Sequence, residues 1–363
     1  SAALVMIICA GIIFRQLGYI QNRNLGLDTD QVIYCNVKGS MSEKYYAFRQ
    51  ELLKYPGIKG VANSSSLPTW NDQGTYWIGW DGKNEEDDIY MDINKVDYGF
   101  VSTFGIEMAE GRNFSMDRPA DSTCFILNES AIRVMQMEDP IGKRFMLWGV
   151  EGQIIGVMKD FNFKSLHKEI GPLCLFMTNP YTSEIYGYIY IKLDGSDIRK
   201  TLKVIESTWK DINPYYPLDY TFLDEKYEAL YISESRMRSL FTIFAILSIF
   251  LSCLGLYGLS AFMAENRIRE IGIRKALGAR PWQIMTVFSW DALKWILISN
   301  LIAWPIAWLY TRHWLNDFAY KIKVSPMIFI LSGLVVLAIA LAALSFQALK
   351  VSRSNPAESI KHE

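Results

Sequence analysis

The segment from Glu265 to Arg280, which reads ENRIREIGIRKALGAR, constrains this chain more than any other. It is dense in Arg and Lys and lies between two long apolar runs, Ser239 to Ala264 and Val287 to Tyr310. The first run carries no charge over about 26 residues, which as a helix exceeds the ~30 Å thickness of a hydrocarbon core. The sequence therefore predicts an α-helical membrane protein with a short basic loop between two spans.

Two further apolar runs complete the predicted membrane part. Met327 to Leu349 is long enough to span, whereas the opening run, SAALVMIICAGIIF, is shorter than the ~20 residues that a span needs. The opening run also lacks the basic start of a signal peptide, so we expect it to be the outer part of a first span. The predicted segments are a partial first span at 1–14, an extracytoplasmic α+β core domain at 15–223, a stalk helix at 224–238, a second span at 239–264, a cytoplasmic coupling loop and helix at 265–285, a third span at 286–310, a short extracytoplasmic loop at 311–326, a fourth span at 327–349 and a cytoplasmic tail at 350–363.

Basic residues in the short loops predict the orientation. The loop between the second and third spans and the C-terminal tail, with Lys350, Arg353 and Lys361, carry more Lys and Arg than the short loop 311–326. Cytoplasmic loops of membrane proteins show this excess. We therefore expect the basic loop and the tail in the cytoplasm and the large domain on the outer side of the membrane.

The large domain reads as a mixture of strands and helices. Gln31 to Val37 alternates as a strand does, and Ser42 to Tyr55 carries apolar residues at helical spacing after a candidate N-cap at Ser42. Ile58 to Ala62 follows a Pro-Gly turn as a second strand. With about 220 residues, this part is large enough to bury a core of its own, so its predicted class is α+β.

Composition and motifs argue against several functions. A net charge of −1, with no strongly basic region outside the loop, argues against a nucleic-acid partner. No GxxxxGK[ST] phosphate loop occurs, so ATP would have to bind to another chain. The cysteines show no CxxC or metal-ligand spacing, and the three histidines are far apart. We expect no catalytic, cofactor-binding or metal-binding residue in this chain. We expect the cysteines to be packing residues, and the minor alternative is a disulfide between two of Cys35, Cys124 and Cys174.

Three tryptophans, Trp70, Trp77 and Trp80, form a weak candidate for an aromatic binding surface. Aromatic residues in strands are more often found in the core or in cross-strand pairs. We therefore assign them no function from the sequence.

Within the basic loop, Asn266 to Leu277 predicts a short amphipathic helix. Ile268, Ile271 and Lys275 share one face, and Gly278 is a natural C-terminal stop. Such a helix could dock in the groove of a partner protein, or it could lie on lipid headgroups as an anchor. The residues alone leave both interpretations open.

Small residues in the second span predict close helix packing. Ser248, Ser252 and Gly255 lie along one helical face, with Gly258 nearby. Small residues let helix backbones approach closely in lipid. The contact could lie within one chain or between two subunits, and the sequence does not distinguish the two.

Seven motifs in this order resemble one family. RIREIGIRKALGAR, followed by a span, and NPAESI in the tail are similar to the FtsX-like domain of MacB-like ABC transporter permeases. LPTW, FGIEMAEGRNFS, ILNESA, DPIGKRF and GVMKDFNFKSLH are similar to the periplasmic core domain of that family. The resemblance covers essentially the whole chain. It implies an α-helical permease half with four spans, of which the first is partial, and a large inserted α+β domain. It also implies that the chain is either cut at its start or the C-terminal half of a two-repeat permease.

The resemblance also implies partners. The permease would sit in the bacterial inner membrane, as a homodimer or with a second permease half, beside a separate cytoplasmic ABC ATPase that uses the ATP. In the family, the loop helix docks on the ATPase, and nucleotide-driven closure moves the stalks and external domains, which is called mechanotransmission. The positions of this chain that correspond to the coupling element are Arg267, Glu270, Ile271, Gly272, Arg274, Lys275, Leu277 and Gly278.

Two functions of different classes are compatible with this architecture. The permease could help to expel a peptide, a drug or a lipoprotein, with a periplasmic adaptor as a further partner. Alternatively, it could pass the state of the ATPase to an extracytoplasmic cell-wall hydrolase. In both, we expect the chain itself not to be an enzyme, and the surface of the external domain decides the substrate or target.

Overall fold

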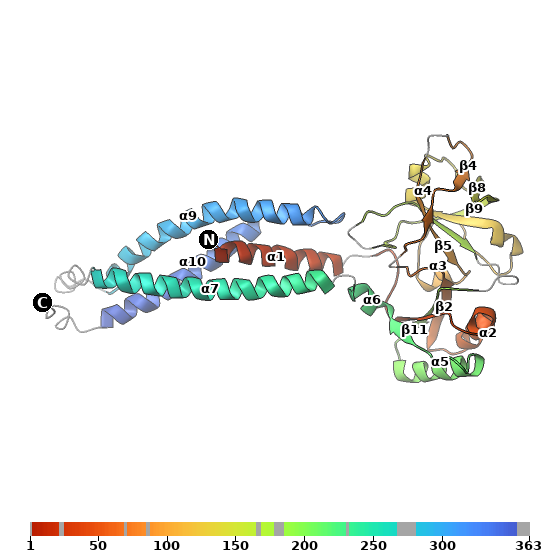
Figure 1. Cartoon of the computed structure of the whole chain (residues 1–363), viewed down its shortest axis with the longest axis horizontal. Coiled ribbons are helices and arrows are strands. Elements are labelled where there is room, and N and C mark those ends of the chain that lie inside the picture. Colours follow the sequence, from red (N-terminus) through yellow and green to blue (C-terminus); the bar gives the residue numbers. More distant parts are fainter. Residues whose placement is uncertain are drawn as a thin grey trace. The chain divides into compact units, whose positions relative to one another are not determined.

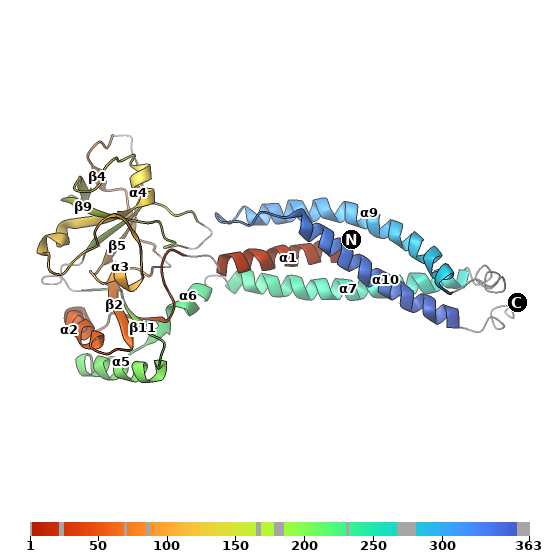
Figure 2. The ribbon, with the colours of Figure 1, turned by 180° about the vertical axis from the view of Figure 1, so that it is seen from behind.

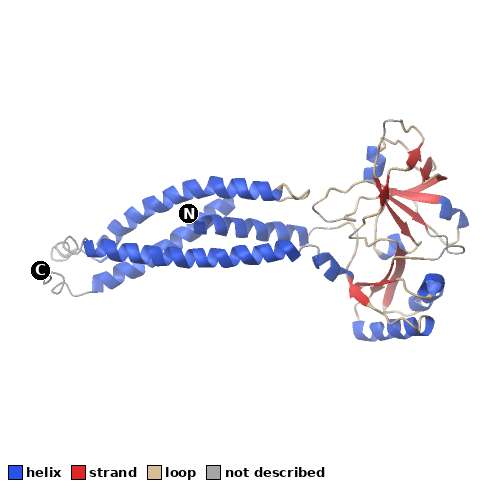
Figure 3. Ribbon diagram, viewed as in Figure 1, coloured by secondary structure: helices blue, strands red, loops and turns tan. Residues whose placement is uncertain are grey.

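The computed structural model describes residues 2–21, 25–68, 71–84, 88–164, 168–177, 185–229, 232–266 and 281–353. Its contacts divide the chain into two compact units. The membrane unit consists of Ser1–Asn22 and Ile232–Glu363, and the core unit consists of Arg23–Tyr231. The described part of the membrane unit has helices as its regular elements, whereas the core unit combines strands with helices (Figure 3).

The core unit is built on one mixed sheet. Its described strands follow the order β12-β1-β11-β2-β5-β10-β7-β9-β8-β4, with β3 paired to β5 and β6 paired to β9. The pairs β10–β5 and β7–β9 are parallel, and the other pairs are antiparallel. The strands are β1 (Val32–Asn36), β2 (Ile58–Ser64), β3 (Gly74–Thr75), β4 (Ile78–Trp80), β5 (Met91–Val96), β6 (Met108–Gly111), β7 (Cys124–Asn128), β8 (Arg144–Leu147), β9 (Val150–Met158), β10 (Leu173–Met177), β11 (Tyr188–Leu193) and β12 (Tyr220–Phe222).

One face of this sheet carries two separate helical covers. Helices α2 (Met41–Leu53) and α5 (Ile198–Ile212) pack together over β1, β11 and β2, where the rings of Phe48 and Trp209 meet edge to face at 5.7 Å. Helix α4 (Glu129–Val134) covers a second core cluster, which includes residues of β4, β5, β7 and β8. Figures 1 and 2 show α2 and α5 at one end of the unit and α4 at the other. The remaining helices of the unit are α3 (Phe100–Thr103), the 3-10 helix η1 (Pro119–Thr123) and α6 (Leu223–Ala229).

The periodic stretches of the core unit form the predicted elements. Helix α2 buries Tyr45, Phe48 and Leu52, the residues that repeat at helical spacing, and β1 and β2 confirm the predicted strands. The candidate cap is wrong, because α2 begins at Met41 and the side chain of Ser42 donates to the carbonyl oxygen of Gly39 at 3.1 Å.

No sequence pattern predicted α3, β6 or β10. Strand β10 contributes residues to core clusters on both faces of the sheet, so its residues, LCLFM, show no apolar–polar alternation. Helix α3 and β6 span only four residues each, which is too short for a periodic signal. These elements are defined by their neighbours in space.

The membrane unit contains α1 (Ala2–Gln21), α7 (Ile232–Asn266), α9 (Pro281–Leu315) and α10 (Pro326–Arg353). Its described core contains Leu4, Ile8 and Ile12 of α1, Ala303 and Ala307 of α9, and Phe329 of α10. The two alanines lie one turn apart and are fully buried, which lets the neighbouring helices approach closely. Figure 1 shows α1 alongside α7.

Helix α1 extends beyond the predicted segment 1–14, through Arg15 and Gln16 to Gln21. Gln16 is buried, but its amide is satisfied: Nε2 donates to the carbonyl oxygen of Tyr320 at 2.8 Å, and Oε1 accepts from the backbone N–H of Ile322 at 2.9 Å. These two tertiary hydrogen bonds offset the cost of burying the amide of Gln16. The helix therefore continues past the residue at which the sequence suggested an end.

Two of the described helices have the length and hydropathy of membrane spans, with apolar windows at Ala3–Ile20 and Ser235–Gly255. Within α10, Pro326–Ile339 is a shorter apolar stretch. By length and composition, these two helices are able to cross a membrane, and the four complete crossings stay a prediction. Helix α7 contains the predicted second span, 239–264, and begins within the predicted stalk, 224–238.

All five cysteines are free, so the minor alternative of a disulfide is wrong. Burial raises the pKa of the Cys35 thiol to about 12. Cys124 and Cys174 are also buried, and burial is the main cause that raises the pKa of each of these two thiols. These thiols therefore act as packing groups.

Candidate functional site

The predicted coupling element lies outside the described residues. Helix α7 ends at Asn266 and α9 begins at Pro281, so the described helices flank the basic loop on both sides. The role of the loop in coupling stays a prediction. Its residues are Arg267, Glu270, Ile271, Gly272, Arg274, Lys275, Leu277 and Gly278.

The small residues of α7 are described, and Ser252, Gly255 and Gly258 face away from the described part of the chain. Ser248 is half-buried, whereas Ser252, Gly255 and Gly258 are exposed. A Cβ atom added at either glycine would have no described neighbour within 4 Å. The side chain of Ser252 donates to the carbonyl oxygen of Ser248 at 2.7 Å, so its hydroxyl is satisfied within the helix. This face is therefore smooth, nearly apolar and uncovered by the described helices.

Helix α7 exposes large apolar side chains along most of its described length. Ile246, Phe250 and Leu251 are each at least 60% exposed, whereas Ala245 is buried. A soluble surface would not carry a row of such residues, because each would cost free energy in water. Lipid or another apolar helix must cover α7.

An apolar groove of about 600 Å³ lies between α9 and the start of α10. Pro305 lies inside α9 and lacks an N–H, so the carbonyl oxygen of Leu301 loses its usual helical partner. Trp304 Nε1 is buried without a hydrogen-bond partner among the described residues. The groove suits a hydrocarbon group. Its lining residues are Leu301, Trp304, Pro305, Trp308, Pro326, Phe329 and Ile330.

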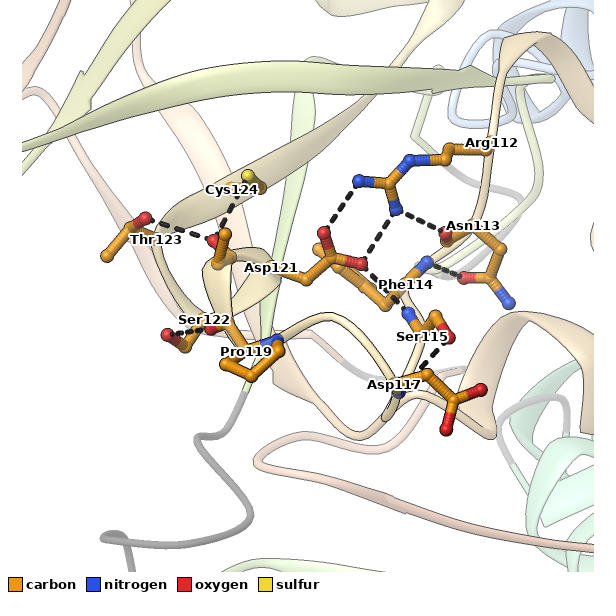
Figure 4. Close-up of polar contacts among 11 residues, drawn as sticks. Arg112, Asn113, Phe114, Ser115, Asp117, Pro119, Asp121, Ser122, Thr123 and Cys124 are labelled. Atoms are coloured by element: carbon orange, nitrogen blue, oxygen red, sulfur yellow. Dashed lines mark hydrogen bonds and ion pairs between the residues drawn. The ribbon is translucent and has the colours of Figure 1, made fainter.

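In the core unit, the FGIEMAEGRNFS motif contains an arginine, Arg112, that forms an ion pair with the buried carboxylate of Asp121. Arg112 binds Asp121 through both terminal nitrogens, at 2.7 and 2.6 Å, and Ser115 N donates to the same carboxylate at 2.9 Å (Figure 4). Burial would raise the pKa of Asp121, but the bonds from Arg112 and Ser115 hold it below its ordinary value. The pair holds the loop after β6 against the 3-10 helix η1.

A second polar cluster joins the ILNESA motif to the GVMKDFNFKSLH motif. Asp160 Oδ1 accepts from Asn128 Nδ2 at 2.8 Å and from Ser130 N at 2.9 Å, and Oδ2 accepts from Ser130 Oγ at 2.7 Å. Asn128 Oδ1 caps α4 through Ala131 N and also accepts from Leu173 N of β10 at 2.8 Å. These groups bind each other, so the two motifs have a structural role.

A third buried carboxylate connects β5 to α2. Asp97 is fully buried and accepts a 2.7 Å hydrogen bond from Tyr45 Oη, and Arg49 Nε lies 3.5 Å from the same oxygen. Burial raises the pKa of Asp97 to about 6, although Arg49 and Tyr45 favour the ionised form. Asp97 is therefore a candidate for pH-dependent stability.

Sequence reasoning found the motifs but not these contacts. Asp97, Asp121 and Asp160 are isolated acidic residues in the sequence, and their partners lie at other positions in the fold. Among the tryptophans, Trp80 lies in the core, as strand aromatics usually do, and Trp77 is 63% exposed. Trp70 lies outside the described residues. No group of His, Cys, Asp and Glu that could hold a metal occurs among the described residues.

Two family descriptions match the chain, in order and without overlap. Residues 2–207 match the MacB-like periplasmic core domain, and residues 242–356 match the FtsX-like permease C-terminal domain. The first match covers more than half of the chain and includes the core-unit motifs, and the second includes the basic loop and the first two residues of the tail motif, Asn355 and Pro356.

Known relatives agree with these matches. The macrolide export ATP-binding/permease protein MacB of Sodalis glossinidius is 25% identical over 228 residues, which cover 58% of this chain and 34% of that protein. The uncharacterized ABC transporter permease YknZ of Bacillus subtilis is 21% identical over 227 residues, which cover 60% of this chain and 56% of that protein. The chain thus spans about a third to a half of the length of these curated relatives.

Among solved structures, the periplasmic region of MacB from Actinobacillus actinomycetemcomitans is similar, with 16% identity and a TM-score of 0.41 over 58% of this chain and 97% of that one. A domain of a permease protein from Porphyromonas gingivalis matches with 19% identity and a TM-score of 0.37, over 52% of this chain and 86% of that one. On the two domain matches, the chain belongs to the ABC transporter permeases that combine a MacB-like periplasmic core domain with an FtsX-like permease domain.

Proposed function

We propose that this chain is a permease subunit that couples ATP hydrolysis by a separate cytoplasmic ATPase to movement of its own extracytoplasmic domain. The observation that carries the proposal is α7, which runs as one helix over 35 residues. At ~1.5 Å per residue, α7 is roughly 52 Å long and exceeds a ~30 Å hydrocarbon core by more than half. A helix of this length can transmit movement across the membrane and beyond it.

The proposal places four spans in the bacterial inner membrane, formed by α1, α7, α9 and α10. Helices α9 and α10, of 35 and 28 residues, are long enough to cross, and both consist largely of apolar residues, as α7 does. The excess of basic residues in the loop after α7 supports a cytoplasmic position for that loop. The ATPase would then bind on the loop side.

A second permease half, or a second copy of this chain, would pack against the small-residue face of α7. Gly255 and Gly258 have open space at the position of an added Cβ, and Leu251, about one turn before Gly255, exposes a large side chain. A smooth helical face of this kind supports close packing of two helices in lipid. Membrane lipid would cover the rest of the exposed apolar surface.

Among the two candidate functions, the relatives favour export. The Sodalis relative is described as a macrolide export protein, and such a description supports efflux more than control of a cell-wall hydrolase. In this chain, the exported molecule would be a peptide, a drug or a lipoprotein, with a periplasmic adaptor as a further partner. The coupling mechanism is the same for either function.

The test uses the full-length protein with its cognate ATPase. We would compare wild type with Ile271→Asp and Arg274→Glu, and use Arg280→Glu as a matched control because it makes the same charge change outside the proposed coupling set. We expect both loop variants to insert normally and to lose copurification and stimulated ATP hydrolysis, and the control to keep them. If both loop variants bind and stimulate normally, the proposed coupling site is wrong.

A further inference from the structure

On the face of the core-unit sheet that carries helices, a strip of the sheet lies between α4 and the α2–α5 pair. Along β5, Met91 and Ile93 point into the cluster under α4, and Asp97 reaches α2 through Tyr45. Side chains alternate along a strand, so Lys95 lies on the same face, between Ile93 and Asp97. Lys95 therefore occupies the strip that neither α4 nor the α2–α5 pair covers.

Lys95 has no acidic partner on this strip among the residues that the structure describes. Its ammonium nitrogen makes no hydrogen bond or ion pair to any described residue, although the side chain is half-buried. The nearest acid on this face of β5 is Asp97, whose carboxylate already binds Tyr45 and Arg49. Burial lowers the pKa of Lys95. A half-buried cation is costly unless it is paired, and no described acidic residue pairs with Lys95.

Aromatic residues lie on both sides of Lys95. On one side, the ammonium lies 5.0 Å from the centre of the Tyr186 ring, a cation–π distance. On the other side, Phe176 is the register partner of Lys95 in the parallel pair β10–β5, so their side chains are neighbours on this face. Trp148 meets Phe176 edge to face at 5.8 Å. We call Tyr186, Lys95, Phe176 and Trp148 the Lys95 row.

The two ends of the row are held in place and open to solvent. Asn63 Nδ2 donates to the carbonyl oxygens of Tyr186 and Tyr188, at 3.1 and 2.9 Å. Between them, Gly187 has φ of +85°, and a Cβ there would lie 2.3 Å from the carbonyl oxygen of Ser64. Tyr186 is 49% exposed and Trp148 is 45% exposed, so both rings offer a free face.

Trp148 has a backbone conformation that is unfavourable for a bulky aromatic residue. It forms the turn between β8 and β9 with Gly149, and the two have φ of +54° and +82°. Two-residue turns with positive φ at both positions favour Asn-Gly, and a bulky aromatic residue there is strained. The indole is thus placed at the end of the row at a local cost, which indicates a role beyond the turn.

We propose that the Lys95 row binds an organic carboxylate that carries a flat apolar or aromatic group. The carboxylate would pair with the Lys95 ammonium, and the apolar group would lie against Phe176 and the exposed rings of Tyr186 and Trp148. A single ammonium acts as a point charge, and the aromatic residues add contact area and orientation. The carboxylate could belong to a small acid or to the C-terminus of a peptide. This inference concerns the core unit and does not depend on coupling to the ATPase.

The test measures protection of Lys95 from amine acetylation in the full chain in nanodiscs, read by peptide mass spectrometry. The probes are benzoate, its neutral analogue benzamide, inorganic phosphate, and hippurate, in which glycine supplies the carboxylate as in a peptide terminus. We expect benzoate or hippurate to slow acetylation of Lys95 several-fold, and benzamide and phosphate to have little effect. Lys210, exposed on α5, is the internal control and should react equally throughout. Stronger protection by hippurate assigns the site to a peptide-type carboxylate.

A second variant separates binding from folding. Trp148→Asn suits the turn and should keep the thermal stability of the core unit, but it should reduce protection of Lys95 by the carboxylates. Equal protection by benzamide and benzoate, by phosphate and benzoate, or no protection of Lys95 by any carboxylate, would overturn the proposal. Full protection in Trp148→Asn would overturn the role of the indole.

Discussion

The two units of this chain bury opposite kinds of groups. In the core unit, Asp97, Asp121 and Asp160 lie inside or at the edge of the fold, and each is surrounded by donors from other elements. In the membrane unit, α7 leaves large apolar side chains such as Phe250 and Leu251 exposed. The core unit therefore binds these three carboxylates within itself, whereas the membrane unit relies on lipid or on another chain to cover its apolar surface. This contrast predicts different responses to mutation.

The largest expected effect is on the core unit. Asp160→Ala removes the charged acceptor of Asn128 Nδ2, Ser130 Oγ and Ser130 N. Asn128 Nδ2 keeps its bond to Gly171 O and Ser130 Oγ keeps its bond to Ile170 O, so the backbone N–H of Ser130 is the donor left without an acceptor. We expect the free energy of unfolding of this unit to fall by about 4 kcal/mol. Thermal unfolding followed by near-UV circular dichroism would measure it, with exposed Asp117→Ala as control. A loss no larger than that of the control would show that the cluster does not hold the two motifs.

The next effect concerns the continuity of α7. Ser239 is exposed, and Ser239→Pro removes the backbone N–H that would bond to the carbonyl of Ser235, at a cost of about 3 kcal/mol in the helix. If α7 transmits movement, the variant should still support ATP hydrolysis by the partner but lose export. Ser239→Ala, which keeps the helix, should retain both. Normal export by the proline variant would contradict mechanotransmission through an unbroken α7.

Asp97 should make the core unit more stable at mildly acidic pH. Its pKa rises from the ordinary 3.8 to about 6 in the folded state, so the folded state holds this proton more tightly. The resulting stabilisation is fully present below pH ~4 and is lost as the pH rises through about 6. A rise of this size corresponds to about 3 kcal/mol. The free energy of unfolding, measured from pH 4 to pH 7, should fall by this amount more in wild type than in Asp97→Asn. Parallel plots of the free energy of unfolding against pH for the two proteins would contradict the prediction.

The smallest effect on stability, and the sharpest test of the open face, comes from cysteine crosslinking. Ser252→Cys should change the stability little, because Ser252 is exposed, and should form an intermolecular disulfide in the membrane under mild oxidation. Ile246→Cys, on another face of α7 and 61% exposed, is the matched control and should crosslink less. Equal crosslinking at both positions would show that the small-residue face is not the interface.

Local patterns predicted elements well where a single face is buried. The spacing of Tyr45, Phe48 and Leu52 indicated α2, and the alternation in Gln31 to Val37 indicated β1. Strand β10 was missed because its residues pack into core clusters on both faces of the sheet and are all apolar. The end of α1 was also placed too early, because the contacts of Gln16 with Tyr320 and Ile322 cannot be read from its neighbours in the sequence.

One candidate site could be predicted from the sequence, whereas the other is recognised only in the fold. The basic loop stands out because the positive-inside rule acts on composition, so the coupling element could be proposed from residues alone. Lys95, by contrast, is an ordinary residue of a strand until Phe176, Tyr186 and Trp148 are placed around it. Asp160 and Ser130 are 30 residues apart in the chain and in contact in the fold.

Membrane character, expected orientation, the main helices and strands, and the family resemblance all follow from the order of the residues. The reason is that hydropathy, charge and side-chain periodicity act over one to a few turns, where covalent spacing sets the geometry. Only the tertiary structure decides which acids are buried and bound, which face of α7 stays uncovered and which cation lacks a partner. Those properties depend on groups that are distant in the chain and meet only after the sheet and the helices have packed.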